Sequence, residues 1–189
     1  MRLRFLFTKE KGAMKTRIFA VVLLLALAFT ACDDESTQGG YPVYFKYTYT
    51  YPLTIAEGAG QFIVIEREGL TAFNVTYYEG AAKRKKKIEL SEWQLKEGAM
   101  HYGLGGLILG RPAAFDGNRW AYDLACPKCK QGSRKLTVEL EGGIAHAHCK
   151  ACACKFDLNN GGYAIEGNAK RPLFRYNVHD YGSDIVIVN

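Results

Sequence analysis

Two pairs of cysteines, each with two residues between its members, constrain this chain more than any other feature. Cys126 and Cys129 form the first pair, and Cys149 and Cys152 form the second pair after nineteen intervening residues. A hairpin of that length brings the two turns together, so that four thiolates can surround one metal ion as a tetrahedron. Zinc, at about 2.3 Å from each sulfur, is the usual ion at such a site. Iron or a small iron–sulfur cluster also accepts four thiolates.

The same cysteines have a second interpretation as disulfides. A chain that leaves the cytoplasm keeps disulfides, and the two pairs would then be bonded within each turn or between the turns. Cys154 is an additional thiol that is a possible alternate ligand in place of Cys152. His146 and His148 precede the second pair in a predicted strand, where alternation puts both on one face. His148 is a further possible ligand, although solvent exposure is the expectation for both histidines.

The first 32 residues are predicted to be a lipoprotein signal peptide. A short basic segment begins at Met14, the expected start of translation, and an apolar run follows from Ile18 to Phe29. Twelve apolar residues are too few to cross a bilayer, which needs about 20, and they suit a signal peptide. The run ends in a sequence that resembles a lipobox, which predicts lipidation of Cys32. A plain secretory signal cleaved after Ala31 is the alternative.

Residues 33–40 are predicted to form a flexible acidic tether between the lipid and the folded part. The acidic cluster resembles the surface-export signal of Bacteroidetes lipoproteins. The membrane is therefore an expected partner through the anchor on Cys32. We expect the protein in the cell envelope, at the outer membrane or cell surface rather than at the inner membrane.

Net charge argues against a nucleic-acid-binding protein. The formal charge of +6 falls to about +1 from Asp33 onward, where 19 basic residues face 18 acidic ones. One basic run, Lys83 to Lys87, is predicted to be a solvated loop between strands. Contact of this run with an anionic surface or glycan is the alternative.

Alternating apolar and polar residues, with glycine, asparagine, aspartate or proline between the segments, predict an all-β sandwich or barrel over residues 41–189. A short helical turn is expected within residues 90–100, starting at Ser91, and nowhere else in the folded part. The predicted strands are 43–51, 62–66, 73–78, 107–109, 119–124, 136–140, 144–148, 173–178 and 185–188.

Several segments together resemble the Rieske-fold [2Fe–2S] family, and in particular the Rieske-like lipoproteins of Bacteroidetes. These segments are Gly105-Gly106-Leu107-Ile108, Trp120-Ala121-Tyr122-Asp123-Leu124-Ala125-Cys126-Pro127, Phe156-Asp157-Leu158, Gly161-Gly162, and Gly167 to Leu173 with Tyr176. The likeness covers about residues 104–189 and is weaker before them. It implies a β-sandwich that carries a small metal-binding subdomain, at about residues 122–172, built like a zinc ribbon or rubredoxin. It also implies that residues 167–172 form a loop covering the site.

The chain departs from the family at the ligands. Lys128 stands where the first cluster histidine is expected, and Cys152 stands where the second is expected. Two imidazoles set the high potential of a Rieske cluster, so an ordinary Rieske centre is not expected here. The change to four cysteines favours one tetrahedral ion, with structural zinc as the first expectation.

We found no nucleophile elbow, H-E-x-x-H spacing or phosphate-binding glycine motif, and we predict that the protein is not an enzyme. The sequence predicts a protein that acts by binding or scaffolding, through an unidentified protein or glycan partner. One alternative is an electron-transfer protein that carries iron or a [2Fe–2S] cluster on the four cysteines. A second is a metal-free β-module held by disulfides.

Overall fold

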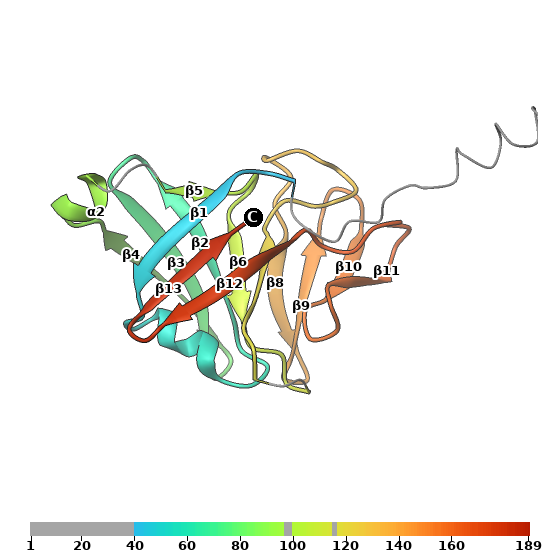
Figure 1. Ribbon diagram of the computed structural model, residues 1–189. Coiled ribbons are helices and arrows are strands. Elements are labelled where there is room, and N and C mark those ends of the chain that lie inside the picture. Colours follow the sequence, from blue (N-terminus) through green and yellow to red (C-terminus); the bar gives the residue numbers. More distant parts are fainter. Residues whose placement is uncertain (1–39, 97–99, 115–116) are drawn as a thin grey trace, which may run out of the picture. The chain divides into compact units, whose positions relative to one another are not determined.

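A computed structural model describes residues 40–96, 100–114 and 117–189 (Figure 1). The predicted signal peptide, Cys32 and residues 33–39 of the predicted tether lie outside these residues. The described part is all-β, with a short 3₁₀-helix η1 (Leu53–Glu57) and a short α-helix α2 (Glu92–Lys96). The strands are β1 (Val43–Thr48), β2 (Phe62–Glu68), β3 (Ala72–Glu79), β4 (Ala82–Glu89), β5 (His101–Tyr102), β6 (Leu107–Gly110), β7 (Trp120–Asp123), β8 (Thr137–Glu141), β9 (Ile144–Cys149), β10 (Cys154–Asp157), β11 (Tyr163–Glu166), β12 (Arg175–Tyr181) and β13 (Asp184–Val188).

Nine strands form one antiparallel sheet in the order β4-β3-β2-β6-β7-β12-β13-β1-β5. Phe45 of β1 and Phe73 of β3 lie far apart in this order, yet their rings meet edge to face with centroids 5.4 Å apart. The sheet therefore curls until its two ends enclose a common core, and Figure 1 shows β1 and β13 crossing in front of β2 and β3. This first core includes Ile63, Ile65 and Leu109, which alternate along β2 and β6 with residues on the outer face.

Four strands in the order β11-β10-β9-β8 form a second, smaller antiparallel sheet. It packs on the outer face of the large sheet, where Phe62, Val64 and Ile108 join Val138 and Phe156 in a second core. Strands β6 and β7 are consequently buried on both faces, as is the first half of β2. The predicted fold class, an all-β sandwich or barrel with a small added metal-binding part, is confirmed at the level of two antiparallel sheets and a cysteine cluster.

The prediction of a loop over Lys83 to Lys87 is wrong. These residues belong to β4, which pairs with β3 at eight positions from Ala72↔Glu89 to Glu79↔Ala82. The basic run lacks the alternation that marks a half-buried strand, because β4 ends the sheet and its residues from Ala82 to Lys87 are all exposed. Hydrogen bonding to β3 and not burial makes this segment a strand.

The predicted helical turn is confirmed as α2, but the expectation that it would be the only helical segment is wrong, because residues 53–57 form η1. The backbone N–H and the hydroxyl of Ser91 both donate to Oε1 of Gln94, at 2.9 and 2.8 Å. This pairing of a serine with a glutamine three residues later is a capping arrangement that starts a helix. No helix among the described residues is long and apolar enough to span a membrane.

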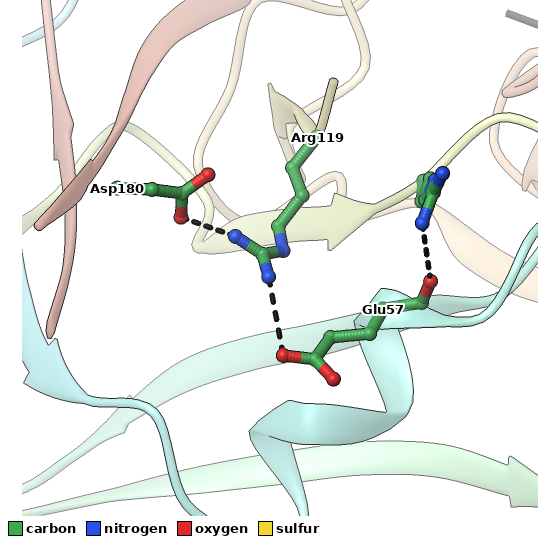
Figure 2. A network of polar contacts seen from close by, with 4 residues as sticks. Glu57, Arg119 and Asp180 are labelled. Atoms are coloured by element: carbon green, nitrogen blue, oxygen red, sulfur yellow. Dashed lines mark hydrogen bonds and ion pairs between the residues drawn. The ribbon is translucent and has the colours of Figure 1, made fainter. Parts of the chain in front are cut away.

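Arg119, just before β7, is connected by ion pairs to strand β12 and to the 3₁₀-helix η1 (Figure 2). Its guanidinium forms ion pairs with Asp180 of β12 and, at 3.2 Å, with Glu57 of η1. It also lies over the ring of Tyr49, 4.4 Å from the centroid. The arginine side chain is 18% exposed, whereas both carboxylates are 52% exposed. Through Tyr49, which packs against the first core, the network lies at the margin of that core.

Candidate metal centre

The four predicted ligand sulfurs lie together at one end of the small sheet. Cys126 and Cys129 follow β7, Cys149 is the last residue of β9, and Cys152 lies in the turn before β10. All four sulfur atoms are within 4.8 Å of one another, and the structure gives 3.6 Å for Cys126–Cys152 and 3.8 Å for Cys129–Cys149. Four sulfurs at about 2.3 Å from a central ion would be about 3.8 Å apart, whereas a disulfide bond is about 2.05 Å long. The arrangement is that of thiols around a shared point.

The two cysteine turns repeat one local conformation. In the first turn the backbone N–H groups of Lys128 and Cys129 donate to the sulfur of Cys126. The N–H groups of Ala151 and Cys152 donate in the same way to the sulfur of Cys149. The residue after each turn, Lys130 or Ala153, is left-handed, with φ of 51° and 53°. Amide donors aimed at a sulfur favour its thiolate form, the form that binds metal.

Burial and backbone hydrogen bonding shift the pKa values of these thiols in opposite directions. Burial raises the pKa of Cys126, and the two amide donors offset it only in part. Burial also acts to raise the pKa of Cys149, but the amide and thiol hydrogen bonds to its sulfur outweigh it, so that pKa is lowered. Several thiolates in one half-buried place repel each other, and a cation among them removes that cost.

Cys154 lies beside the four-sulfur group but not in it. It is fully buried at the start of β10, and its S–H points to the carbonyl oxygen of Cys152 at 3.7 Å. Burial raises its pKa. All five cysteines of the described part are free. Cys154, which was predicted to be a possible alternate ligand, therefore lies outside the four-sulfur group.

The histidines lie on the other face of β9. His146 and His148 share one face, as predicted, but they are half-buried and not solvent-exposed as expected, while Ala145, Ala147 and Cys149 are buried on the opposite face. Among the described residues, the cluster of candidate ligands contains four cysteines and does not contain His148. His148 lies in register with Thr137 of β8 and Lys155 of β10.

Residues 167–172, predicted to cover the site, lie against it. The amine of Lys128, in the first cysteine turn, donates to the side-chain oxygen of Asn168. Ala169 packs on the second core, and Gly167 lies over Cys154. Lys128, which stands where the resemblance implies a ligand, thus connects a cysteine turn to the covering loop.

Gly167 → Ala is expected to displace this covering loop. Gly167 has a φ of +82°, and an added Cβ would lie 2.8 Å from the sulfur and 2.9 Å from the Cα of Cys154. Left-handed strain alone costs about 1–2 kcal/mol, and the contact with backbone adds to it. Chemical denaturation should show a loss above about 2 kcal/mol. Gly142 → Ala is the matched control, because Gly142 has a φ of +58° and its added Cβ meets nothing within 4 Å. Equal losses in both variants would contradict the proposed contact.

Asp123 is an organising residue that the sequence analysis left without a role. Its buried carboxylate accepts hydrogen bonds from the N–H groups of Leu104 (2.7 Å), Gly105 (3.0 Å) and Ala125 (2.6 Å) and from the hydroxyl of Tyr176 (2.6 Å). Burial, and then this hydrogen bond, raise the pKa of Tyr176, so its hydroxyl stays a neutral donor. Asp123 therefore fixes the chain three residues before Cys126. An acid inside an apolar strand was the signal in the sequence.

Comparison with known proteins adds no relative. No family model matches the chain, and no curated protein matches it. The resemblance to the Rieske-fold family therefore stays a prediction that rests on the residue pattern.

The geometry limits the chemistry of the site. Four thiolates that close on one ion leave no coordination position for water or substrate. Such a site can hold two loops together or pass single electrons, according to the ion. Direct activation of a substrate by the ion does not fit this donor set.

Proposed function

We propose that this protein is a lipid-anchored cell-envelope protein whose Rieske-like domain is held together by one structural zinc ion. Cys126, Cys129, Cys149 and Cys152 would bind the ion, and Cys32 would carry the lipid. The domain would act by binding or scaffolding at the outer membrane or cell surface, toward a protein or glycan partner. The observation that carries the proposal is the enclosure of one point by four sulfurs within 4.8 Å of one another.

The sulfur spacing supports one ion over a two-iron cluster. A [2Fe–2S] cluster divides four ligands between two irons, so sulfurs on different irons lie farther apart than sulfurs that share one ion. The four sulfurs here are close in every combination. Zinc is the usual ion in four-cysteine sites and is redox-silent, so its role would be structural, holding the two cysteine turns together.

Electron transfer by a single iron on the same sulfurs is the second candidate. The observation that favours it is the pair of amide donors to Cys126 and to Cys149, since hydrogen bonds to ligand sulfurs tune the potential of iron–sulfur sites. The two candidates share their ligands and differ in the ion.

Elemental analysis of the full chain purified from its native host tests the proposal. We expect one zinc per chain, a colourless protein and five cysteines that titrate after denaturation with a chelator, namely the four ligands and the buried Cys154. Iron without zinc, with visible absorption bleached by dithionite, would establish the second candidate instead. Thiols that stay untitratable without a reductant would mean disulfides and overturn both.

The anchor is tested separately. Cells grown with radiolabelled palmitate should incorporate label into the wild-type chain and not into Cys32 → Ala. Label in both chains, or in neither, would contradict lipidation at Cys32 and leave the metal result unaffected.

A further inference from the structure

The free edge of the large sheet carries an unusual density of positive charge. Strand β4 ends the sheet, and its five consecutive residues Lys83 to Lys87, which we call the basic edge, are all exposed. The side chains of Arg84 and Lys87 are 60% and 54% exposed. Alternation places Lys83, Lys85 and Lys87 on one face and Arg84 and Lys86 on the other, so both faces of the strand are cationic.

The rest of the protein does not share the positive charge of the basic edge. From Asp33 onward the chain has 19 basic and 18 acidic residues, and the basic edge holds five of the basic ones. The remaining 14 basic residues are outnumbered by the acids. Ion pairs of Arg84 with Glu79 and of Lys87 with Glu89 are solvent-exposed, and exposed pairs hold their partners weakly. Among the described residues, the basic edge thus concentrates positive charge on one exposed strand, which would attract a negative surface.

Exposed apolar side chains lie at one end of the basic edge. Leu70, in the turn between β2 and β3, is 77% exposed, and Trp93 and Leu95 of α2 are 48% and 43% exposed. The N–H of Leu90, just after β4, donates to the carbonyl oxygen of Thr71 at 2.7 Å, which joins this turn to the end of β4. Leu70 and Leu95 line the same cavity of about 220 Å³. We call Leu70, Trp93 and Leu95 the apolar tip.

We propose that the basic edge and the apolar tip dock the domain on a bilayer that contains anionic lipids. Arg84, Lys85 and Lys87 would contact headgroup phosphates, whereas the amine of Lys83 donates to the carbonyl oxygen of Val138 and that of Lys86 lies over the ring of Tyr51. Trp93, Leu70 and Leu95 would enter the interfacial region. Basic residues near an anionic surface combined with a few buried aromatic and aliphatic side chains are the general requirement for interfacial binding. The inference rests on the proposed envelope function only for the presence of a membrane.

The tether supports a bilayer as the occupant. Eight residues between Cys32 and Tyr41 span at most about 28 Å, so an anchor on Cys32 would keep the domain at the membrane surface. An acidic peptide that pairs with β4 is disfavoured, because lysines along an edge strand are a common means of preventing strand addition. The near-neutral overall charge disfavours a nucleic acid.

Vesicle binding of the unlipidated chain from Asp33 to Asn189 tests the proposal. Both sheets and both cores lie within this segment, so it contains the whole described fold. We expect sedimentation with vesicles of phosphatidylcholine and phosphatidylglycerol, and none with phosphatidylcholine alone. Trp120 is 8% exposed and Trp93 is 48% exposed, so a blue shift of emission on binding reports mainly Trp93.

A pair of matched variants tests the location of the surface. Lys85 → Gln with Lys87 → Gln should lower vesicle affinity roughly tenfold or more. Arg134 → Gln with Lys135 → Gln removes the same charge from other exposed positions and should change it less than about twofold. Circular dichroism and metal content should be unchanged in both, since these side chains are exposed and are not candidate ligands.

Four outcomes would overturn the proposal. They are no binding to anionic vesicles, equal losses in the two paired variants, binding without a shift in tryptophan emission, and binding to heparin or an acidic peptide without binding to vesicles. Palmitate labelling reports the anchor independently, so failure of anchoring and failure of docking are distinguishable.

Discussion

Cys126 → Ala is expected to release the metal ion and to unfold the small sheet. Metal binding at a structural site is coupled to folding, with apparent free energies of about 10–16 kcal/mol in small zinc domains. Three thiolates cannot close the tetrahedron, and Cys126 is fully buried at the start of the first cysteine turn. We expect metal content to fall close to zero and stability to drop by more than about 4 kcal/mol. Hydrogen exchange should rise across β8 to β11.

Cys154 → Ala is the control for this experiment. Cys154 is also fully buried in the second core, but its sulfur is outside the four-sulfur group. The substitution should cost about 1 kcal/mol, as for a small cavity, and leave one metal per chain. Loss of metal in Cys154 → Ala with retention in Cys126 → Ala would reverse the ligand assignment.

Asp123 → Asn is expected to be the most damaging substitution outside the cysteines. Each carboxylate oxygen accepts two hydrogen bonds, from Gly105 and Ala125 on one side and from Leu104 and Tyr176 on the other. An amide keeps one accepting oxygen and turns an NH₂ group toward two donors. Buried donors left without acceptors cost about 1–3 kcal/mol each, so we expect a loss of about 3 kcal/mol or more in urea denaturation.

Tyr176 → Phe separates the loss of one donor from the loss of the acceptor. The carboxylate of Asp123 would keep its three backbone donors, so the cost should be about 1.5 kcal/mol. The Asp123 variant should therefore lose at least about twice as much. A Tyr176 loss equal to or above that of Asp123 → Asn would show that the hydroxyl, and not the carboxylate, organises this region.

Alternation of apolar and polar residues, or a short apolar run, predicted the strands that are buried on one face or on both faces. Segments such as 62–66 and 144–148 fall within the observed β2 and β9. The strands missed are β4, β5, β10 and β11. β4 is cationic from Lys83 to Lys87 and β5 has two residues, so neither shows the alternation. β10 alternates but has only four residues, as does β11, and both are held mainly by pairing to β9 and to one another. Backbone pairing across a sheet depends on distant residues, and local composition does not encode it.

The cysteine spacing predicted the four-sulfur group, because a short turn and a hairpin leave few other places for these thiols. The spacing did not predict the supports. Asp123 accepts donors up to 53 residues away, and Lys128 bonds Asn168, 40 residues along the chain. Such long-range contacts follow from the fold, so the local spacing of residues in a single sequence could not predict them.

Because the small sheet covers the outer faces of β2 and β6, its loss would uncover more than the metal ligands. Phe62, Val64 and Ile108 are between 0% and 8% exposed in the folded protein and would meet water together. A chain without its ion would then expose an apolar surface on the outer face of β2 and β6. Such a species is expected to aggregate or be degraded. If the proposed metal site is correct, the supply of metal would therefore decide how much folded protein accumulates.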